Sequence, residues 1–289
     1  MEGRPRCRPR QPRIGPDNRS LRFAPASNQN KRIRCALWIV DIISGTNTLQ
    51  EVSTLPRVPR MQALLRFYQS SIGKKIVVAV TGVMLIGFVM IHMLGNFSIY
   101  LGQDAINTYA LKLKSTGPIL WIFRIGLLVV FALHIINTIQ LARMNRKARP
   151  ENYRKNNKIQ ASRASLSMVL SGSVVLAFLI YHLLHFTVGA TDPKYLDLHD
   201  AQGRHDVYSM VVMAFQKPLV SGFYILAMAL LCMHLSHGFA SAFQTVGVRN
   251  PTLAPYLKYA SIGLAGLIFI GNSSIPLAVL LGFLKLPQI

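Results

Sequence analysis

The sequence predicts an all-α integral membrane protein built around a bundle of five transmembrane helices. Two observations predict this fold class. The chain of 289 residues is 51% hydrophobic and only 15% charged, with a mean hydropathy of +0.35, which is too apolar for an ordinary soluble domain. It also contains five long apolar stretches, and a helix that crosses the hydrocarbon core of a membrane needs about 20 such residues.

Each stretch is predicted to be a helix, because backbone groups in lipid must find their hydrogen bonds within the segment. The predicted spans are residues 76–101, 119–142, 165–189, 218–246 and 259–284. The only formal charge inside them is Arg124, near the start of the second span. No carboxylate lies within any span, so the sequence shows no intramembrane relay of Asp or Glu residues.

Residues 1–60 are predicted to lie outside the bundle. They are rich in Arg, Pro, Asn and Ser and hold 12 Lys+Arg against 4 Asp+Glu. Their one apolar run, 36–43, is too short to span a membrane and contains Asp41. We expect a basic, disordered extension or an upstream start codon with Met61 as the true beginning; an Arg-rich transit peptide is a third interpretation. The membrane domain is therefore predicted to cover residues 61–289.

The net charge of +22 indicates orientation in a membrane rather than binding of nucleic acid. Eight cations and a single glutamate fall in the loop between the second and third spans, and a short basic loop marks the cytoplasmic side. The eight cations are Arg143, Arg146, Lys147, Arg149, Arg154, Lys155, Lys158 and Arg163. On the opposite side, the loop 191–217 holds four aspartates against three cations. The N-terminus is therefore predicted to be cytoplasmic.

Four of the five predicted spans carry a histidine well inside the apolar stretch. They are His92, His134, His182 and His234. An imidazole in hydrocarbon is costly unless its ring nitrogens are occupied, so these residues are functional candidates. At about 1.5 Å of helix rise per residue, the first and third lie roughly 25 Å from the cytoplasmic ends of their spans, and the other two roughly 12 and 16 Å. Two levels result, each with histidines from two different helices.

This arrangement predicts a membrane cytochrome that holds two haems through pairs of axial histidines. A single histidine in a span is more often a hydrogen bonder between helices, but four at two matched levels favour ligands of haem iron. The three cysteines, Cys7, Cys35 and Cys232, form no CxxCH motif. The predicted cofactors are therefore two non-covalent haem b groups.

Three further residues are secondary candidates for the same site. His237 is as deep as His134, so depth alone does not choose between His234 and His237. His185 lies near the outer surface, where a haem propionate or a quinone is a plausible partner. Arg124 is expected either to pair with a propionate or to extend to the membrane interface. The remaining histidines, His199 and His205, are expected to be solvated in the outer loop.

The first and third predicted spans share a sequence pattern. Thr81-Gly82 precedes His92 in the first, and Ser171-Gly172 precedes His182 in the third at the same distance. Both spans also place a phenylalanine four residues before the histidine. Parallel repeats of this kind occur in membrane folds, and the second and fourth spans then correspond through His134 and His234. Glycines in the spans leave room for a porphyrin or for close helix packing. They are Gly82, Gly87, Gly126, Gly172 and Gly222.

From about Gln62 to Leu284 the chain resembles the five-helix, di-haem cytochrome b subunit (b558 type) of succinate dehydrogenase and fumarate reductase. The resemblance is carried by four stretches: Thr81-Gly-Val with His92, His134 before the basic turn, Ser171-Gly with His182, and Gly222-Phe-Tyr leading to His234-Leu-Ser-His-Gly and Gly247. The spacing from His234 to Gly247 matches the family and selects His234 over His237. The resemblance implies the axial pairs His92/His182 for the distal haem and His134/His234 for the haem nearer the cytoplasm.

The resemblance also implies partners. A flavoprotein with FAD and an iron–sulfur subunit would dock on the cytoplasmic face, against the basic loop 143–163. This chain would pass electrons between the iron–sulfur subunit and a membrane quinone, menaquinone by family likeness, in a bacterial cytoplasmic membrane. Dicarboxylate chemistry would occur on another subunit. The outer loop offers Asp104 but lacks the glutamate that some family members use in quinol chemistry.

Two alternatives remain open from the sequence. The cytochrome b anchor of a hydrogenase or formate dehydrogenase would also hold two haems, although its catalytic partners face outward. A histidine-using transporter or metal permease would need intramembrane carboxylates or thiols, of which Cys232 alone is present.

Overall fold

A computed structural model of the chain describes residues 60–148, 168–248 and 250–287. Five helices in these residues are long and apolar enough to cross a membrane, as the sequence predicts. The described residues contain no β-strand, only an isolated bridge between His199 and His205. The predicted extension before Arg60 and the part of the basic loop from 149 to 167 lie outside the described residues.

The five spanning helices differ from the predicted spans mainly at their ends. They are α4 (Ser71–Asn96, continued by the 3-10 helix η2, Phe97–Leu101), α6 (Pro118–Lys147), α8 (Met168–Phe186), α10 (Pro218–Thr245) and α11 (Leu253–Leu280). The sequence placed the end of the second span at 142, but α6 continues to Lys147. Its last turn carries Arg146 and Lys147, whose positive charges complement the C-terminal dipole of the helix.

Local sequence explains where these helices begin. The short helix α3 (Arg60–Gln69) precedes α4, and Ser70 between them accepts a hydrogen bond from the Gly73 amide at 3.0 Å. Pro118 and Pro218 stand in the first turns of α6 and α10, where a missing amide hydrogen leaves no intrahelical bond unmade.

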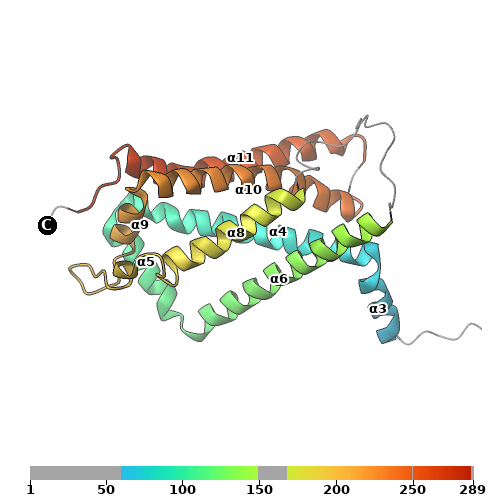
Figure 1. The fold of residues 1–289 in the computed structure, drawn as a ribbon, viewed down its shortest axis with the longest axis horizontal. Helices are drawn as coiled ribbons and strands as arrows, with labels where there is room; N and C mark the ends of the chain where they lie inside the picture. The colour runs from blue at the N-terminus through green and yellow to red at the C-terminus, as the bar shows by residue number, and fades with distance from the viewer. Residues whose placement is uncertain (1–59, 149–167, 249, 288–289) are drawn as a thin grey trace, which may run out of the picture. The chain divides into compact units, whose positions relative to one another are not determined.

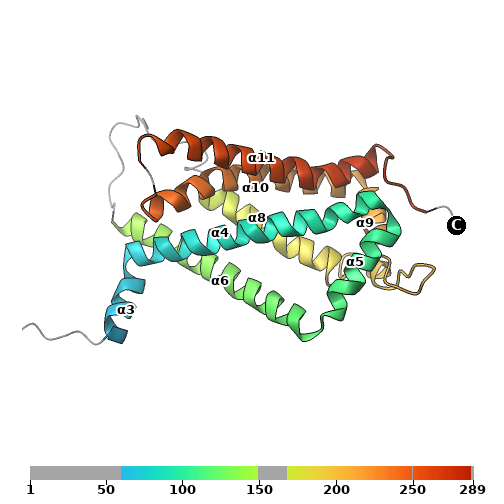
Figure 2. The ribbon, with the colours of Figure 1, turned by 180° about the vertical axis from the view of Figure 1, so that it is seen from behind.

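In the pairs α4–α6, α8–α10 and α10–α11, the second helix packs against the first and runs in the opposite direction (Figure 1). α4 packs against α6 and α10, and α10 packs against α8 and α11. Figures 1 and 2 both show α10 and α11 side by side along their length and α6 diverging from α4 toward α5. The end where α4 begins and α6 ends is called the basic end, and the opposite end is called the acidic end. All described carboxylates belong to the acidic end: Asp104, Asp192, Asp197, Asp200 and Asp206.

The connections at the acidic end are more ordered than the loops expected there. The segment after the first span forms α5 (Gln103–Ser115), and the segment before the fourth forms η3 (Pro193–Leu196) and α9 (Val207–Phe215). Apolar side chains of α5 and α9, including Ile106 and Val212, bury against the end of the bundle. These short segments therefore contribute to the main apolar core.

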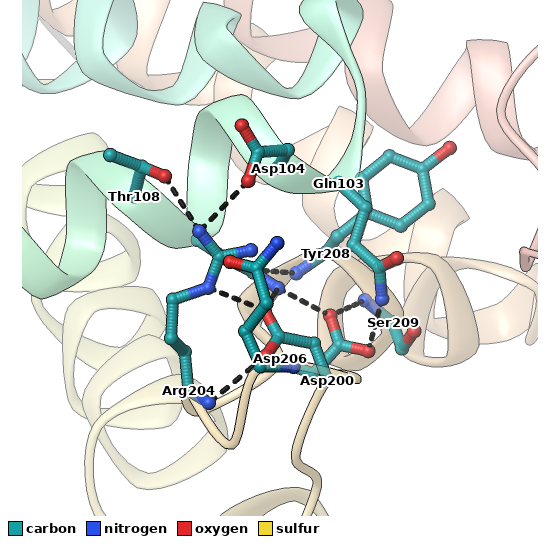
Figure 3. Close-up of polar contacts among 10 residues, drawn as sticks. Gln103, Asp104, Thr108, Asp200, Arg204, Asp206, Tyr208 and Ser209 are labelled. Carbon is teal, nitrogen blue, oxygen red and sulfur yellow. Dashed lines mark hydrogen bonds and ion pairs between the residues drawn. The ribbon is translucent and has the colours of Figure 1, made fainter.

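A buried polar network joins the two connections (Figure 3). The Asn107 amide donates to Asp200 and to Asp206 at 3.0 Å each, and the Arg204 guanidinium donates to Asp200 at 2.7 Å. Although burial opposes ionisation of Asp200, the hydrogen bonds from Asn107 and from Arg204 outweigh it and lower the pKa to about 2. The Asp206 carboxylate also caps α9 through the Ser209 amide. The network therefore fastens α5 to the segment that leads into α9.

Candidate functional site

The structure places the four predicted histidines on four different spanning helices. His92 lies on α4, His134 on α6, His182 on α8 and His234 on α10. The rings of His92, which is exposed, and of His182 lie edge to face, with centroids 5.9 Å apart and planes at 89°. With a metal–nitrogen bond of about 2 Å, two imidazoles on opposite sides of one metal ion have centroids about 6 Å apart. The separation of the His92 and His182 rings is close to this value.

His134 meets a hydroxyl from the neighbouring helix. Thr81 on α4 is buried, and its Oγ1 lies 3.1 Å from His134 Nδ1. The same hydroxyl donates its proton to the Val77 carbonyl at 2.6 Å. Since a hydroxyl has one proton, Oγ1 accepts from the imidazole and Nδ1 is the protonated nitrogen. The other ring nitrogen, Nε2, is left with a free lone pair, which is the form that binds a metal.

His234 repeats this arrangement in the second half of the chain. Ser171 Oγ on α8 lies 3.3 Å from His234 Nδ1 and donates to the Met168 carbonyl at 3.2 Å. The Ser171 hydroxyl has one proton, so it donates either to the Met168 carbonyl or to Nδ1, and in the first case Nδ1 carries the proton as in His134. We call each hydroxyl with its following glycine, Thr81-Gly82 and Ser171-Gly172, a clasp.

The glycine of each clasp makes room for the imidazole. A Cβ added at Gly82 would lie 3.2 Å from His134 Cε1, and one added at Gly172 would lie 3.3 Å from His234 Cε1. Both distances are shorter than ordinary van der Waals contact. A Cβ at Gly87, Gly126 or Gly222 would meet no other atom of the described residues within 4 Å. Two of the five glycines singled out in the sequence therefore have a defined role against a histidine ring.

His182 has a more crowded surrounding than His92. The Tyr224 hydroxyl on α10 lies 3.4 Å from His182 Nδ1 and 3.0 Å from His185 Nδ1. His185 is 3% exposed and stacks on Phe186 with centroids 4.2 Å apart. The Tyr224 hydroxyl therefore lies within hydrogen-bond distance of both imidazoles. His185 therefore belongs to the outer site through Tyr224.

The other secondary candidates lie differently. His237 makes no side-chain hydrogen bond to another described residue, whereas His234 meets Ser171. The two remaining histidines of the outer connection pair with each other in the isolated bridge, and His199 Nδ1 lies 2.9 Å from the Asp197 carbonyl. Arg124 is exposed and lies over the Trp121 ring at 5.2 Å from its centroid. This position favours the membrane interface over a partner inside the bundle.

The sequence alone did not assign roles to Thr81, Ser171 or Tyr224. The signal for the first two was present, since both hydroxyls occupy the same place in the repeated pattern. The sequence does not show how α4 is rotated against α6 or α8 against α10. This rotation decides that the Thr81 and Ser171 hydroxyls contact a histidine. Comparison with protein-family models, with curated proteins and with solved structures finds no match to this chain.

Proposed function

We propose that the chain is the di-haem cytochrome b membrane anchor of a succinate:quinone oxidoreductase of the succinate dehydrogenase and fumarate reductase type. His92 and His182 would hold one haem iron, and His134 and His234 the other. The observation that carries the proposal is the hydroxyl contact at Nδ1 of His134 and of His234, which leaves Nε2 of each ring without a hydrogen-bond partner among the described residues.

The residues present fit a pair of haems. The outer rings have a separation close to that of two axial ligands, and the inner rings are each oriented by a hydroxyl from a neighbouring helix. Bound haem supplies one-electron redox chemistry. The protein's own part is to fix the ring orientations and to keep water away by means of five apolar helices.

The rest of the proposal depends on family likeness and on charge. A flavoprotein with FAD and an iron–sulfur subunit would dock at the basic end, and the chain would exchange electrons between them and a membrane quinone, menaquinone by family likeness. The described residues contain no group of three or more His, Cys, Asp or Glu side chains arranged to hold a metal ion. A transporter with a multidentate ion site is therefore less well supported than pairwise axial ligation.

The test is a reduced-minus-oxidised absorption spectrum of the purified protein, with haem quantified per polypeptide. We expect a b-type spectrum with two haems per chain and co-purification of a flavoprotein that oxidises succinate. Absence of haem would overturn the proposal. Two haems together with a hydrogenase or formate dehydrogenase partner would keep the ligand assignment and replace the family.

A further inference from the structure

The turn between α3 and α4 brings three helices together at the basic end. The Ser70 hydroxyl donates to the Phe67 carbonyl at 2.6 Å and accepts from the Gly73 amide. A Cβ at Gly73 would collide with the Phe67 backbone, so the tight approach of α3 to α4 requires glycine there. The turn places the Tyr68 ring beside Lys74, whose Nζ lies 4.8 Å from the ring centroid.

Lys74 is buried at this junction. Its side chain is 8% exposed, and Nζ donates to the Gln140 side-chain carbonyl on α6. A lysine near the end of a span normally extends its ammonium into water. Here the ammonium points between helices toward an aromatic ring and a neutral amide, and none of the ion pairs among the described residues includes it. Burying a cation without an anion costs desolvation free energy, so a bound anion would stabilise the Lys74 ammonium.

A pocket beside this ammonium gathers more positive charge. It has a volume of about 510 Å³ and is lined by Lys74, Gln140, Arg143, Met144, Arg146 and Lys147. Four of the six lining residues are cations, and every described carboxylate lies at the opposite end of the bundle. The pocket therefore has no anionic partner within the described part of the chain.

We propose that this pocket binds the phosphate headgroup of an anionic phospholipid. The pocket lies between the first turn of α4 and the last two turns of α6, level with the ends of two spans, where lipid phosphates are found. Guanidinium and ammonium groups recognise phosphate oxygens through charge-assisted hydrogen bonds. Basic pockets between transmembrane helices are suited to such headgroups. Met144 and the aliphatic stems of the cations provide apolar contact for the glycerol and upper acyl carbons.

The site is separate from the histidine clasps. Lys74 precedes Thr81 by two helical turns on the same face of α4, about 10 Å along the axis. A carboxylate of a prosthetic group bound near His134 is the other oxyanion within range of Lys74. The lipid source is favoured because Arg143, Arg146 and Lys147 are exposed at the end of the span, away from the bundle interior. The proposal does not depend on the proposed function.

The test compares lipid binding by the purified full-length protein, with any co-purified subunits, in nanodiscs of phosphatidylcholine. Spin-labelled cardiolipin and spin-labelled phosphatidylcholine are the probes. We expect Lys74→Gln to weaken cardiolipin association about 10-fold, the effect of losing a charge-assisted hydrogen bond, and to leave phosphatidylcholine unchanged. The matched control, Lys75→Gln, removes an exposed neighbouring charge and should change cardiolipin association less than about 2-fold.

Equal cardiolipin association in Lys74→Gln and the unsubstituted protein would overturn the proposal. Loss of a bound chromophore with unchanged lipid association would also overturn it, in favour of a carboxylate of the prosthetic group. If Lys74→Gln does not fold, Arg143→Gln on the exposed rim provides the same comparison. A preserved cardiolipin preference in that variant would again contradict a phosphate site.

Discussion

The first half of the bundle, α4 with α6, and the second half, α8 with α10, use the same local contacts around different histidines. In each half a hydroxyl–glycine clasp on the first helix contacts a histidine on the second. In each half a phenylalanine one helical turn before the outer histidine lies near its ring. The ring centroids are 5.5 Å apart for Phe88 and His92, and 5.9 Å apart for Phe178 and His182. The sequence repeat is therefore also a repeat of contacts.

The halves differ at their outer histidines. His182 lies among Tyr224, His185 and Phe186, whereas the described structure gives His92 only Phe88 and His182 as ring neighbours. Each helix pair therefore forms its own clasp. The surroundings of the outer histidines differ, because Tyr224, His185 and Phe186 all come from the second half. The following predictions test the equivalence of the clasps first and the link between the halves last.

Removal of an inner histidine is expected to have the largest effect, and the same effect in either half. Under the proposed function, His134→Ala or His234→Ala should each reduce the haem content from two to one per chain, because each ring would provide one of the two ligands of one haem iron. A pyridine haemochromogen assay on purified protein measures this. His237→Ala is the control and should keep both haems. The equivalence fails if His237→Ala loses a haem and His234→Ala does not.

An added methyl group in either clasp is expected to be the next largest perturbation. Gly82→Ala and Gly172→Ala place a Cβ against the histidine ring, so the ring or the helix must shift. Overpacking of this kind costs about 1–3 kcal/mol. Thermal unfolding of the purified protein should therefore show a similar loss in both variants. Gly87→Ala, whose Cβ meets open space, should unfold at nearly the original temperature. A loss confined to one clasp would show that the halves are not equivalent.

Removal of the clasp hydroxyls is expected to weaken haem binding without abolishing it. Thr81→Val and Ser171→Ala take away the acceptor for Nδ1–H, and loss of such a partner typically lowers metal affinity about 10-fold or more. A haem-release assay and a redox titration of the inner haem measure the change. Thr81→Ser keeps the hydroxyl and should restore both the affinity and the midpoint potential. A shift that Thr81→Ser does not reverse would indicate packing rather than hydrogen bonding.

The polar network around Asp200, which joins α5 of the first half to the segment before α9 of the second half, is expected to weaken only in acid. Asp200 has a folded-state pKa of about 2, below its usual 3.8, so its ionised form is favoured by folding. The stability that it contributes is complete above about pH 4 and is lost as the pH falls toward 2. Near-UV circular dichroism against pH should show this loss, and Asp200→Asn should reduce the pH dependence over that interval while leaving the part due to Asp206. Asp197→Asn, at an exposed carboxylate outside the network, is the control. An unchanged acid transition in Asp200→Asn would contradict the assignment.

Much of the fold could be predicted from composition and length alone. Five stretches of the required length and apolarity leave helices as the only way to satisfy the backbone in lipid, and the structure confirms all five. The ends of the helices and the helical form of α5 and α9 could not be predicted. They depend on apolar contacts such as Ile106 with the end of the bundle, which no local pattern reveals.

By itself, the sequence determined that four histidines lie inside four apolar helices and that two of these helices repeat a Thr/Ser-Gly pattern. Only the tertiary structure decided which atoms meet. The rotation of each helix about its axis sets whether Thr81 faces His134 and whether Ser171 faces His234 or His237, and that rotation results from packing across the bundle. The same packing turned Lys74 inward to Gln140, where the sequence indicated only another charge at the end of a span.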